Sequence, residues 1–231
     1  MRQRIQERHP LDQILNDAKN GVGEYPSYYT VFGRYATSEE LKIVYNALLT
    51  ATDDAARVRL LWVFRRAPLP QLNDIVLDWA VDGDEELRAA AIATLAQNTD
   101  ERIHALARAK AAAGQLIGAD SEALGLFVHN YQGEDTQIIV LALTEITPTT
   151  DWEAHDVGWS LIDLAEQHAD PNLAAALRWA YENTPCTNCR YRIVKLLDGF
   201  QSLDDTLLQE CLHDAEEDIR DLACQRLEQR K

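Results

Sequence analysis

The chain has 231 residues, 46% of them hydrophobic, and is long enough to bury a core without disulfide or metal staples. Its 22 Lys and Arg residues against 38 Asp and Glu residues give a net charge of −16, which repels nucleic-acid phosphates and anionic lipid and favours a basic partner or simple solubility. The opening MRQRIQERHPLDQIL has no apolar signal region, and no stretch approaches the about 20 apolar residues of a membrane span, so a cytoplasmic protein with reduced thiols is expected.

The N-terminal segment, residues 1–37, is predicted to be an atypical cap. Within it GVGEYPSYYTVFGRY (21–35) is rich in Gly and aromatic residues and does not fit the repeats that follow. A terminal unit has to cover one end of a repeat core, and we assign this role to the segment. Residues 38–231 are predicted to be repeats. Because no low-complexity linker interrupts the chain, a single domain spanning 1–231 is expected.

Two segments share a layout of two apolar helical stretches around a short acidic turn. They are LNDIVLDWAVDGDEELRAAAIATLAQN (72–98) and TLLQECLHDAEEDIRDLACQRLEQ (206–229). Each is typical of a helix–turn–helix unit. Further helices are predicted at 100–113 with 120–131, at 134–146 with 151–169, and at 171–183 with the helix that begins at CTNC.

Four arginines align the units, each near the start of a second helix: Arg57, Arg88, Arg190 and Arg220. The intervals between them are 31, 102 and 30 residues. Since 102 is three times 34, two further units are expected between the second and third arginine. A period of just over 30 residues indicates a helical repeat.

An apolar stripe of helical period surrounds each arginine. Positions −1, +3, +4 and +7 are apolar in all four units, and so is position −9 in the preceding helix, so two helices are predicted to pack through matching stripes. The columns are Ala56, Leu87, Cys189 and Ile219; Leu60, Ala91, Ile193 and Ala223; Leu61, Ile92, Val194 and Cys224; Phe64, Leu95, Leu197 and Leu227; and Leu48, Trp79, Tyr181 and Cys211.

Acidic residues crowd the start of each second helix. Free N–H groups and the positive end of the helix dipole favour carboxylates there. We therefore interpret them as turns and caps and not as catalytic carboxylates. They are Asp53-Asp54, Asp84-Glu85-Glu86 and Glu216-Glu217-Asp218.

With these units and the pattern D/E-x-x-R-x-x-A-x-x-x-L, best seen around Arg88 and Arg220, the chain resembles the HEAT-repeat superfamily over roughly residues 38–230. The resemblance implies an all-α, right-handed α-solenoid of about five to seven antiparallel helix pairs, which usually serves as a binding scaffold. It implies no particular partner, because fold and function are separable.

The cysteines offer a possible zinc site. Cys186-x-x-Cys189, followed by Cys211 and His213, has ligand types that suit tetrahedral zinc. Against this, Cys189, Cys211 and Cys224 stand in apolar columns, and free cysteine is among the most buried residue types. Cys186 begins a helix, where a depressed thiol pKa would permit a redox role. We expect structural cysteines, no stoichiometric zinc and no cofactor, with a zinc- or thiol-dependent regulatory protein as an alternative.

Signatures of common enzymes are absent: the sequence has no HExxH, G-x-S-x-G, GxxxxGK[ST] or GxGxxG. One element, Trp159-Ser-Leu-Ile-Asp163, resembles the Trp-x-x-x-Asp element of the HEAT-like alkylpurine DNA glycosylases. The resemblance implies that the aspartate supports loss of a damaged base and that Arg190 or Arg192 supplies the family's arginine. Gln225 stands where the family has an aromatic residue, and a charge of −16 disfavours a DNA-binding groove.

Helical angles predict a partner-binding face. At about 100° per residue, positions +1 and +5 lie opposite the core columns. Trp62 is at +5 of its unit. If Gly158 replaces the arginine in the fifth unit, Trp159 and Asp163 take +1 and +5, and the core residues are Val157, Leu161, Ile162 and Ala165.

We therefore predict a non-catalytic protein–protein interaction scaffold with an acidic curved surface, which binds a protein partner through Trp62, Trp159 and Asp163. No binding to membranes or nucleic acid is expected. The alternative for the two tryptophans is burial of both rings between adjacent repeats.

Overall fold

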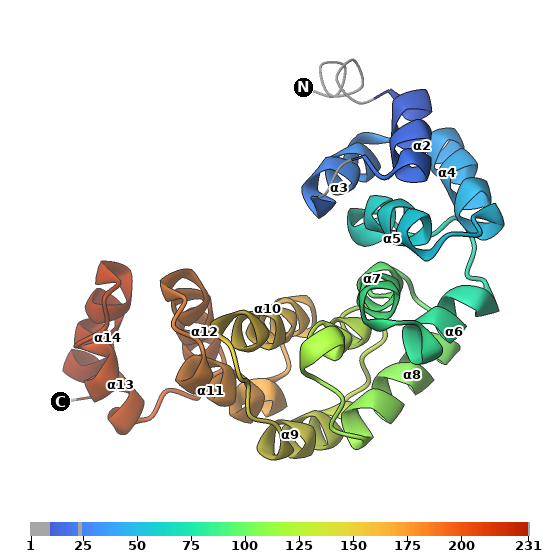
Figure 1. The fold of residues 1–231 in the computed structure, drawn as a ribbon. Helices are drawn as coiled ribbons and strands as arrows, with labels where there is room; N and C mark the ends of the chain where they lie inside the picture. Colours follow the sequence, from blue (N-terminus) through green and yellow to red (C-terminus); the bar gives the residue numbers. More distant parts are fainter. Residues whose placement is uncertain (1–9, 23–24, 231) are drawn as a thin grey trace. The chain divides into compact units, whose positions relative to one another are not determined.

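A computed structural model describes residues 10–22 and 25–230 (Figure 1). Every regular element in these residues is a helix, which confirms the predicted all-α class. No helix in this part of the chain is long and apolar enough to cross a membrane. The chain divides into two compact units between Ala107 and Arg108, within α8 (Glu101–Ala112).

Helix α5 is the centre of the first unit, because it contacts α2, α3, α4 and α7, while α6 packs on α7. The carboxylates of Asp53 and Asp84 accept the N–H groups of Ala56 and Leu87 at 2.9 Å, which confirms them as caps of α5 and α7. The elements are α2 (Leu11–Asn20), α3 (Pro26–Tyr35), α4 (Ser38–Thr50), α5 (Asp54–Val63), η1 (Phe64–Arg66), α6 (Asp74–Asp82) and α7 (Glu85–Leu95).

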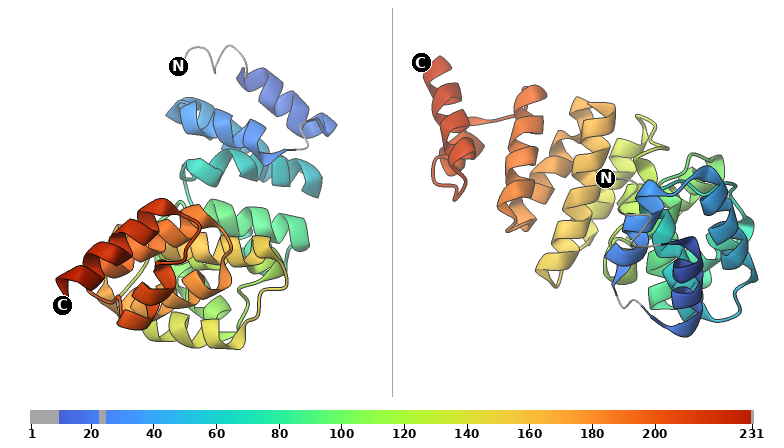
Figure 2. Two further views of the ribbon diagram at one scale, coloured as in Figure 1. Left: turned by 90° about the vertical axis from the view of Figure 1, so that its left-hand side faces the viewer. Right: turned by 90° about the horizontal axis from the view of Figure 1, so that it is seen from above.

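The second helices of the second unit lie in a row, in which α12 contacts α10 on one side and α14 on the other (Figure 2). The first helices α9 and α11 also contact each other. The elements are η2 (Gly118–Asp120), η3 (Ala123–Phe127), α9 (Asp135–Glu145), α10 (Asp151–His168), η4 (Pro171–Leu173), α11 (Ala174–Asn183), α12 (Thr187–Gly199), α13 (Asp205–Cys211) and α14 (Glu217–Gln229).

The α-helix predicted over 120–131 is wrong, because the segment holds the short 3-10 helices η2 and η3. All five residues of η3 are buried, and η3 packs on α10, so the segment has no solvent-facing side of the kind an amphipathic helix presents. Gly125 lowers the helical propensity further. A buried ion pair between Lys110 and Asp120 holds the start of the segment.

The apolar columns are buried as predicted at −9, −1 and +3 in all four aligned units. In the fifth unit the four predicted core residues of α10 are also buried, and so are Ala154, Ser160 and Leu164. The prediction is wrong in the last unit, where Cys224 is exposed and Leu227 is only half-buried. Both residues line an open groove between α13 and α14, together with Asp205 and Gln209 of α13.

Each aligned arginine donates a hydrogen bond to a backbone carbonyl at the end of the preceding helix or in the turn that follows it. The acceptors are Ala51 at 3.0 Å for Arg57, Gly83 at 3.1 Å for Arg88, Tyr181 at 3.3 Å for Arg190, and Asp214 at 2.8 Å for Arg220. Carbonyl groups at a helix end have no partner inside the helix. The arginine of the repeat therefore closes the turn between the two helices of each pair.

The described residues of the N-terminal segment form α2 and α3, which both contact α5. Gly33 makes the contact between α3 and α5 possible. A Cβ atom at this position would lie 1.7 Å from the Val63 carbonyl oxygen, so any other residue would push the two helices apart.

Replacing Gly33 by Ala is expected to lower the free energy of unfolding by about 1–3 kcal/mol, because the added methyl overpacks the α3–α5 contact. The matched control is Gly158→Ala, also within a helix, where the methyl would meet Ala180 Cβ at 3.7 Å. That change should stabilise α10 by up to about 1 kcal/mol. Urea unfolding followed by circular dichroism measures both, and a neutral Gly33→Ala would show that the close contact is not required.

Candidate functional site

The candidate site is the surface where α10 and α12 lie side by side, which we call the α10–α12 face. On α10, residues spaced three or four apart share one side of the helix. On α12 the same holds for residues three apart near its start. The face is made by Trp152, His155, Trp159, Asp163 and Glu166 of α10 and by Cys186, Cys189 and Arg192 of α12.

Trp159 is half-buried and is contacted by side chains from both helices. The ring of His155 stacks on it, with centroids 5.7 Å apart and planes at 28°. The guanidinium carbon of Arg192 lies 4.5 Å from the Trp159 ring centroid, within the range of a cation–π contact. These contacts fix the orientation of the Trp159 ring.

Trp152 extends this row of rings. Its ring centroid lies 6.2 Å from that of His155, and 77% of the residue is exposed. Trp152 is not among the binding residues predicted from the sequence, although its spacing from His155 and Trp159 was the available signal. The row presents the most exposed large apolar side chain of the described residues to solvent.

Carboxylates neutralise the one arginine of the face. Arg192 donates to Asp163 at 3.0 Å and to both oxygens of Glu166, at 2.8 and 3.0 Å. The hydrogen bond from Arg192 holds the pKa of the Glu166 carboxyl below its usual value. One positive charge therefore faces two negative charges. The end of the face that carries Asp163 and Glu166 is acidic.

A thiol pair lies at the other end of the face. Cys186 is the N-cap residue of α12 and is half-buried, whereas Cys189 is fully buried. Burial raises the pKa of the Cys189 thiol to about 12, and the hydrogen bond with Cys186 acts in the same direction. The ligand atoms of His155, Cys186 and Cys189 all lie within 4.8 Å of one another.

Two members of the predicted zinc set, Cys211 and His213, do not join this group. Cys211 is buried under Tyr181, whose hydroxyl lies 3.6 Å from its sulfur, and His213 is exposed after α13. Sequence reasoning missed His155, which is 31 residues before Cys186 and belongs to another helix pair. The spacing of four that relates His155, Trp159 and Asp163 was the signal that could have found it.

No known protein family, curated protein or solved structure matches this chain.

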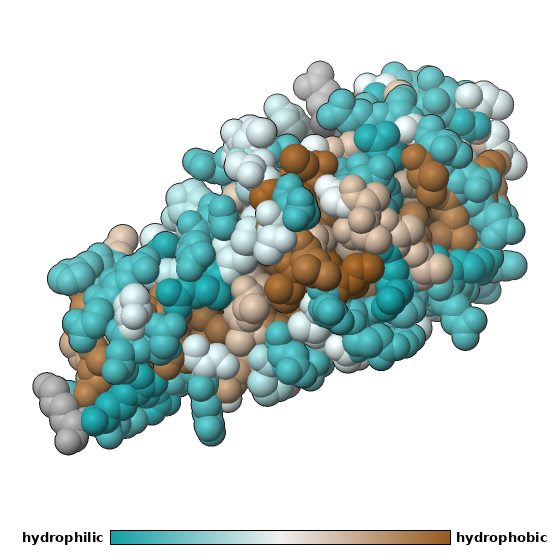
Figure 3. Space-filling view, turned by 90° about the horizontal axis from the view of Figure 1, so that it is seen from below, coloured by the Kyte–Doolittle hydropathy of each residue, from teal (hydrophilic) through white to brown (hydrophobic). Residues whose placement is uncertain are grey.

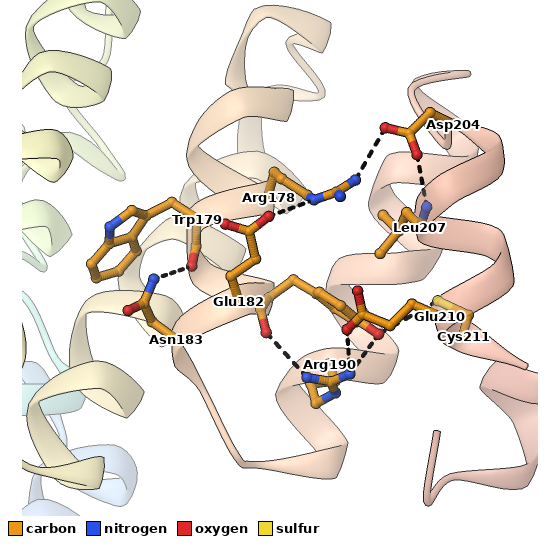
Figure 4. A network of polar contacts seen from close by, with 10 residues as sticks. Arg178, Trp179, Glu182, Asn183, Arg190, Asp204, Leu207, Glu210 and Cys211 are labelled. Atoms are coloured by element: carbon orange, nitrogen blue, oxygen red, sulfur yellow. Dashed lines mark hydrogen bonds and ion pairs between the residues drawn. The ribbon is translucent and has the colours of Figure 1, made fainter. Parts of the chain in front are cut away.

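Of the two arginines that the glycosylase resemblance offers, only Arg192 lies beside Trp159 and Asp163. Arg190 is turned toward α11 and α13, where it stacks at 3.9 Å over the Tyr181 ring and lies 3.5 Å from Glu210 (Figure 4). It also pairs at 2.8 Å with Asp214, which follows α13. Gln225, at the position of the family's aromatic residue, is exposed on α14.

Trp62 belongs to α5 of the first unit, whereas the residues of the α10–α12 face belong to the second. It is half-buried, and its ring centroid is 5.9 Å from that of Tyr29 on α3. Its backbone carbonyl accepts a hydrogen bond from Thr30 at 3.1 Å. Helix α3 therefore covers part of the Trp62 side chain.

Replacing Arg190 by Ala is expected to lower the free energy of unfolding by about 3 kcal/mol, because it leaves the Asp214 carboxylate, 2% exposed, without its cation. The matched variant Arg192→Ala, two residues along the same helix, should cost about 1 kcal/mol or less, since its acidic partners are solvated. Chemical unfolding of both variants measures the difference. Equal losses would mean that Arg190 has no special structural role.

Proposed function

We propose that the chain is a non-catalytic scaffold of the HEAT-like α-solenoid type, which binds a protein partner with a basic surface through the α10–α12 face. The observation that carries the proposal is the row of rings formed by Trp152, His155 and Trp159, which lies beside the carboxylates Asp163 and Glu166. A row of second helices and the repeated arginine contacts support the solenoid arrangement.

The aromatic row has the properties of an interface anchor. Tryptophan is enriched among the residues that dominate binding energy, because its ring buries a large area with few rotatable bonds. Most of the Trp152 side chain is exposed to solvent, so a partner can bury it. The Trp159 ring is already fixed in orientation by His155 and Arg192. Little side-chain entropy would be lost when a partner covers the Trp159 ring. On the face of the molecule seen in Figure 3, apolar residues form patches among hydrophilic ones.

Charge favours a basic partner. Asp163 and Glu166 border the aromatic row, and the whole chain carries a net charge of −16. A positively charged partner would be steered toward such a surface, and its association rate would fall as salt is added. Anionic partners, including nucleic acid, would be repelled.

A DNA glycosylase is the second candidate. Trp159, Asp163 and Arg192 lie together, as the resemblance to the HEAT-like alkylpurine DNA glycosylases implies. The surrounding charge favours the scaffold instead, since both carboxylates that contact Arg192 offset its attraction for a phosphate.

Replacing both Trp152 and Trp159 by Ala is expected to weaken partner binding at least about 30-fold, which corresponds to the about 2 kcal/mol of an interface hot spot. The matched control is Trp179→Ala, a half-buried tryptophan on α11 outside the face, which should change the affinity less than about threefold. Proteins retained by the immobilised chain would be identified, purified and titrated by calorimetry against each variant. Equal affinities of all variants would contradict the proposed face.

Binding of plain or alkylated duplex DNA at physiological salt is expected to be weaker than about 1 µM, because an acidic surface gains little from counterion release. Fluorescence anisotropy measures the binding, and release of alkylated bases measures the activity. Nanomolar binding with base release that is lost in Asp163→Asn would replace the scaffold by the glycosylase.

A further inference from the structure

We propose that His155, Cys186 and Cys189 form a zinc site that joins α10 to the start of α12. The sequence predicts no stoichiometric zinc, and the structure leads us to depart from that prediction because it adds a histidine from the neighbouring helix pair to the cysteine pair. The inference does not depend on the proposed scaffold function.

The geometry of the three side chains is close to that of a metal site. Their ligand atoms lie within 4.8 Å of one another and come from two different helices. Zinc bonds of about 2.3 Å to sulfur and about 2.0 Å to nitrogen place tetrahedral ligand atoms roughly 3.5–3.8 Å apart. Small side-chain rotations would therefore bring the three atoms to ligand distance without a change of fold.

The chemistry of the donors selects the metal. Two thiolates and an imidazole suit Zn²⁺ and disfavour Mg²⁺ and Ca²⁺, which prefer oxygen ligands. The spacing Cys-x-x-Cys is the usual ligand spacing of zinc sites. Cys186 is the N-cap of α12, a helix of 13 residues, so the thiol pair lies at the start of that helix.

The histidine is oriented by its neighbours. Its ring stacks on Trp159, and Asp156 Oδ1 lies 3.8 Å from His155 Nδ1. Asp156 is itself held by a hydrogen bond of 3.1 Å from the Ser121 hydroxyl. These contacts hold the His155 ring beside the two thiols, and either ring nitrogen can serve as a zinc ligand.

Three protein ligands leave one tetrahedral position for water or for a donor atom from another molecule. The bound ion would fix α10 against α12 at the end of the α10–α12 face nearest Trp152. A disulfide between Cys186 and Cys189 is the competing use of the thiols, and it would give His155 no role.

The test uses the full chain, purified under reducing conditions, freed of metal by a chelator and titrated with Zn²⁺ and with Co²⁺. We expect one ion per chain, a rise in the midpoint of thermal unfolding, and a thiolate-to-cobalt charge-transfer band in the near ultraviolet. Absence of binding, or cobalt binding without that band, would overturn the proposal.

Variants separate this site from adventitious binding. Cys186→Ser and His155→Ala should each weaken Zn²⁺ binding more than about 100-fold. Removing a residue that only supports a metal ligand costs at most about that much, so a larger loss identifies a direct ligand. The matched controls Cys224→Ser and His213→Ala remove an exposed thiol and an exposed imidazole outside the site and should bind Zn²⁺ like the unchanged chain. Circular dichroism verifies that each variant is folded. Equal affinity of all four, or purification of the chain with a Cys186–Cys189 disulfide that no reductant opens, would refute the site.

Discussion

The hydrogen bond from an arginine side chain to the carbonyl end of the preceding helix sets the geometry of each aligned helix pair. Arg57, Arg88, Arg190 and Arg220 all make it. Because the side chain starts from a fixed place on the second helix, the bond forms only when that helix is rotated so that the arginine reaches the end of the first helix. The residues at positions −1 and +3 are buried in all four pairs. In the fifth pair Gly158 stands at this position and packs beside Ala180 of the next pair, with the same rotation of the core residues.

The rotation explains why neighbouring residues of one helix have unlike roles. Arg190 and Arg192 are two positions apart, so they project from nearly opposite sides of α12. Arg190 is surrounded by Tyr181 and Asp214 and belongs to the interior contacts of its pair. Arg192 reaches across to Asp163 on α10. The side that faces away from the intra-pair core is the one on which α10 and α12 meet with polar and aromatic side chains.

The α10–α12 face combines residues that are about 30 positions apart in the chain, because consecutive second helices lie side by side. Rings come from α10, thiols and a guanidinium from α12, and each contact between them joins two helix pairs. A partner-binding surface and a metal ion at one end of it are compatible. The metal would hold α12 against α10, the helix that carries the rings, and the acidic end near Glu166 lies beyond Trp159.

The sequence by itself determined the helical class, the buried columns and the carboxylate caps of α5 and α7, because these depend on residue spacing within one helix or one turn. It also placed Trp159 and Asp163 outside the core of their pair. Only the tertiary structure decided that Arg192 and not Arg190 meets Asp163, that His155 lies beside Cys186 and Cys189, that residues 118–127 form 3-10 turns, and that Cys224 is exposed. Each of these depends on which helix covers a given side, and a periodic pattern shows that a side is apolar without showing what lies against it.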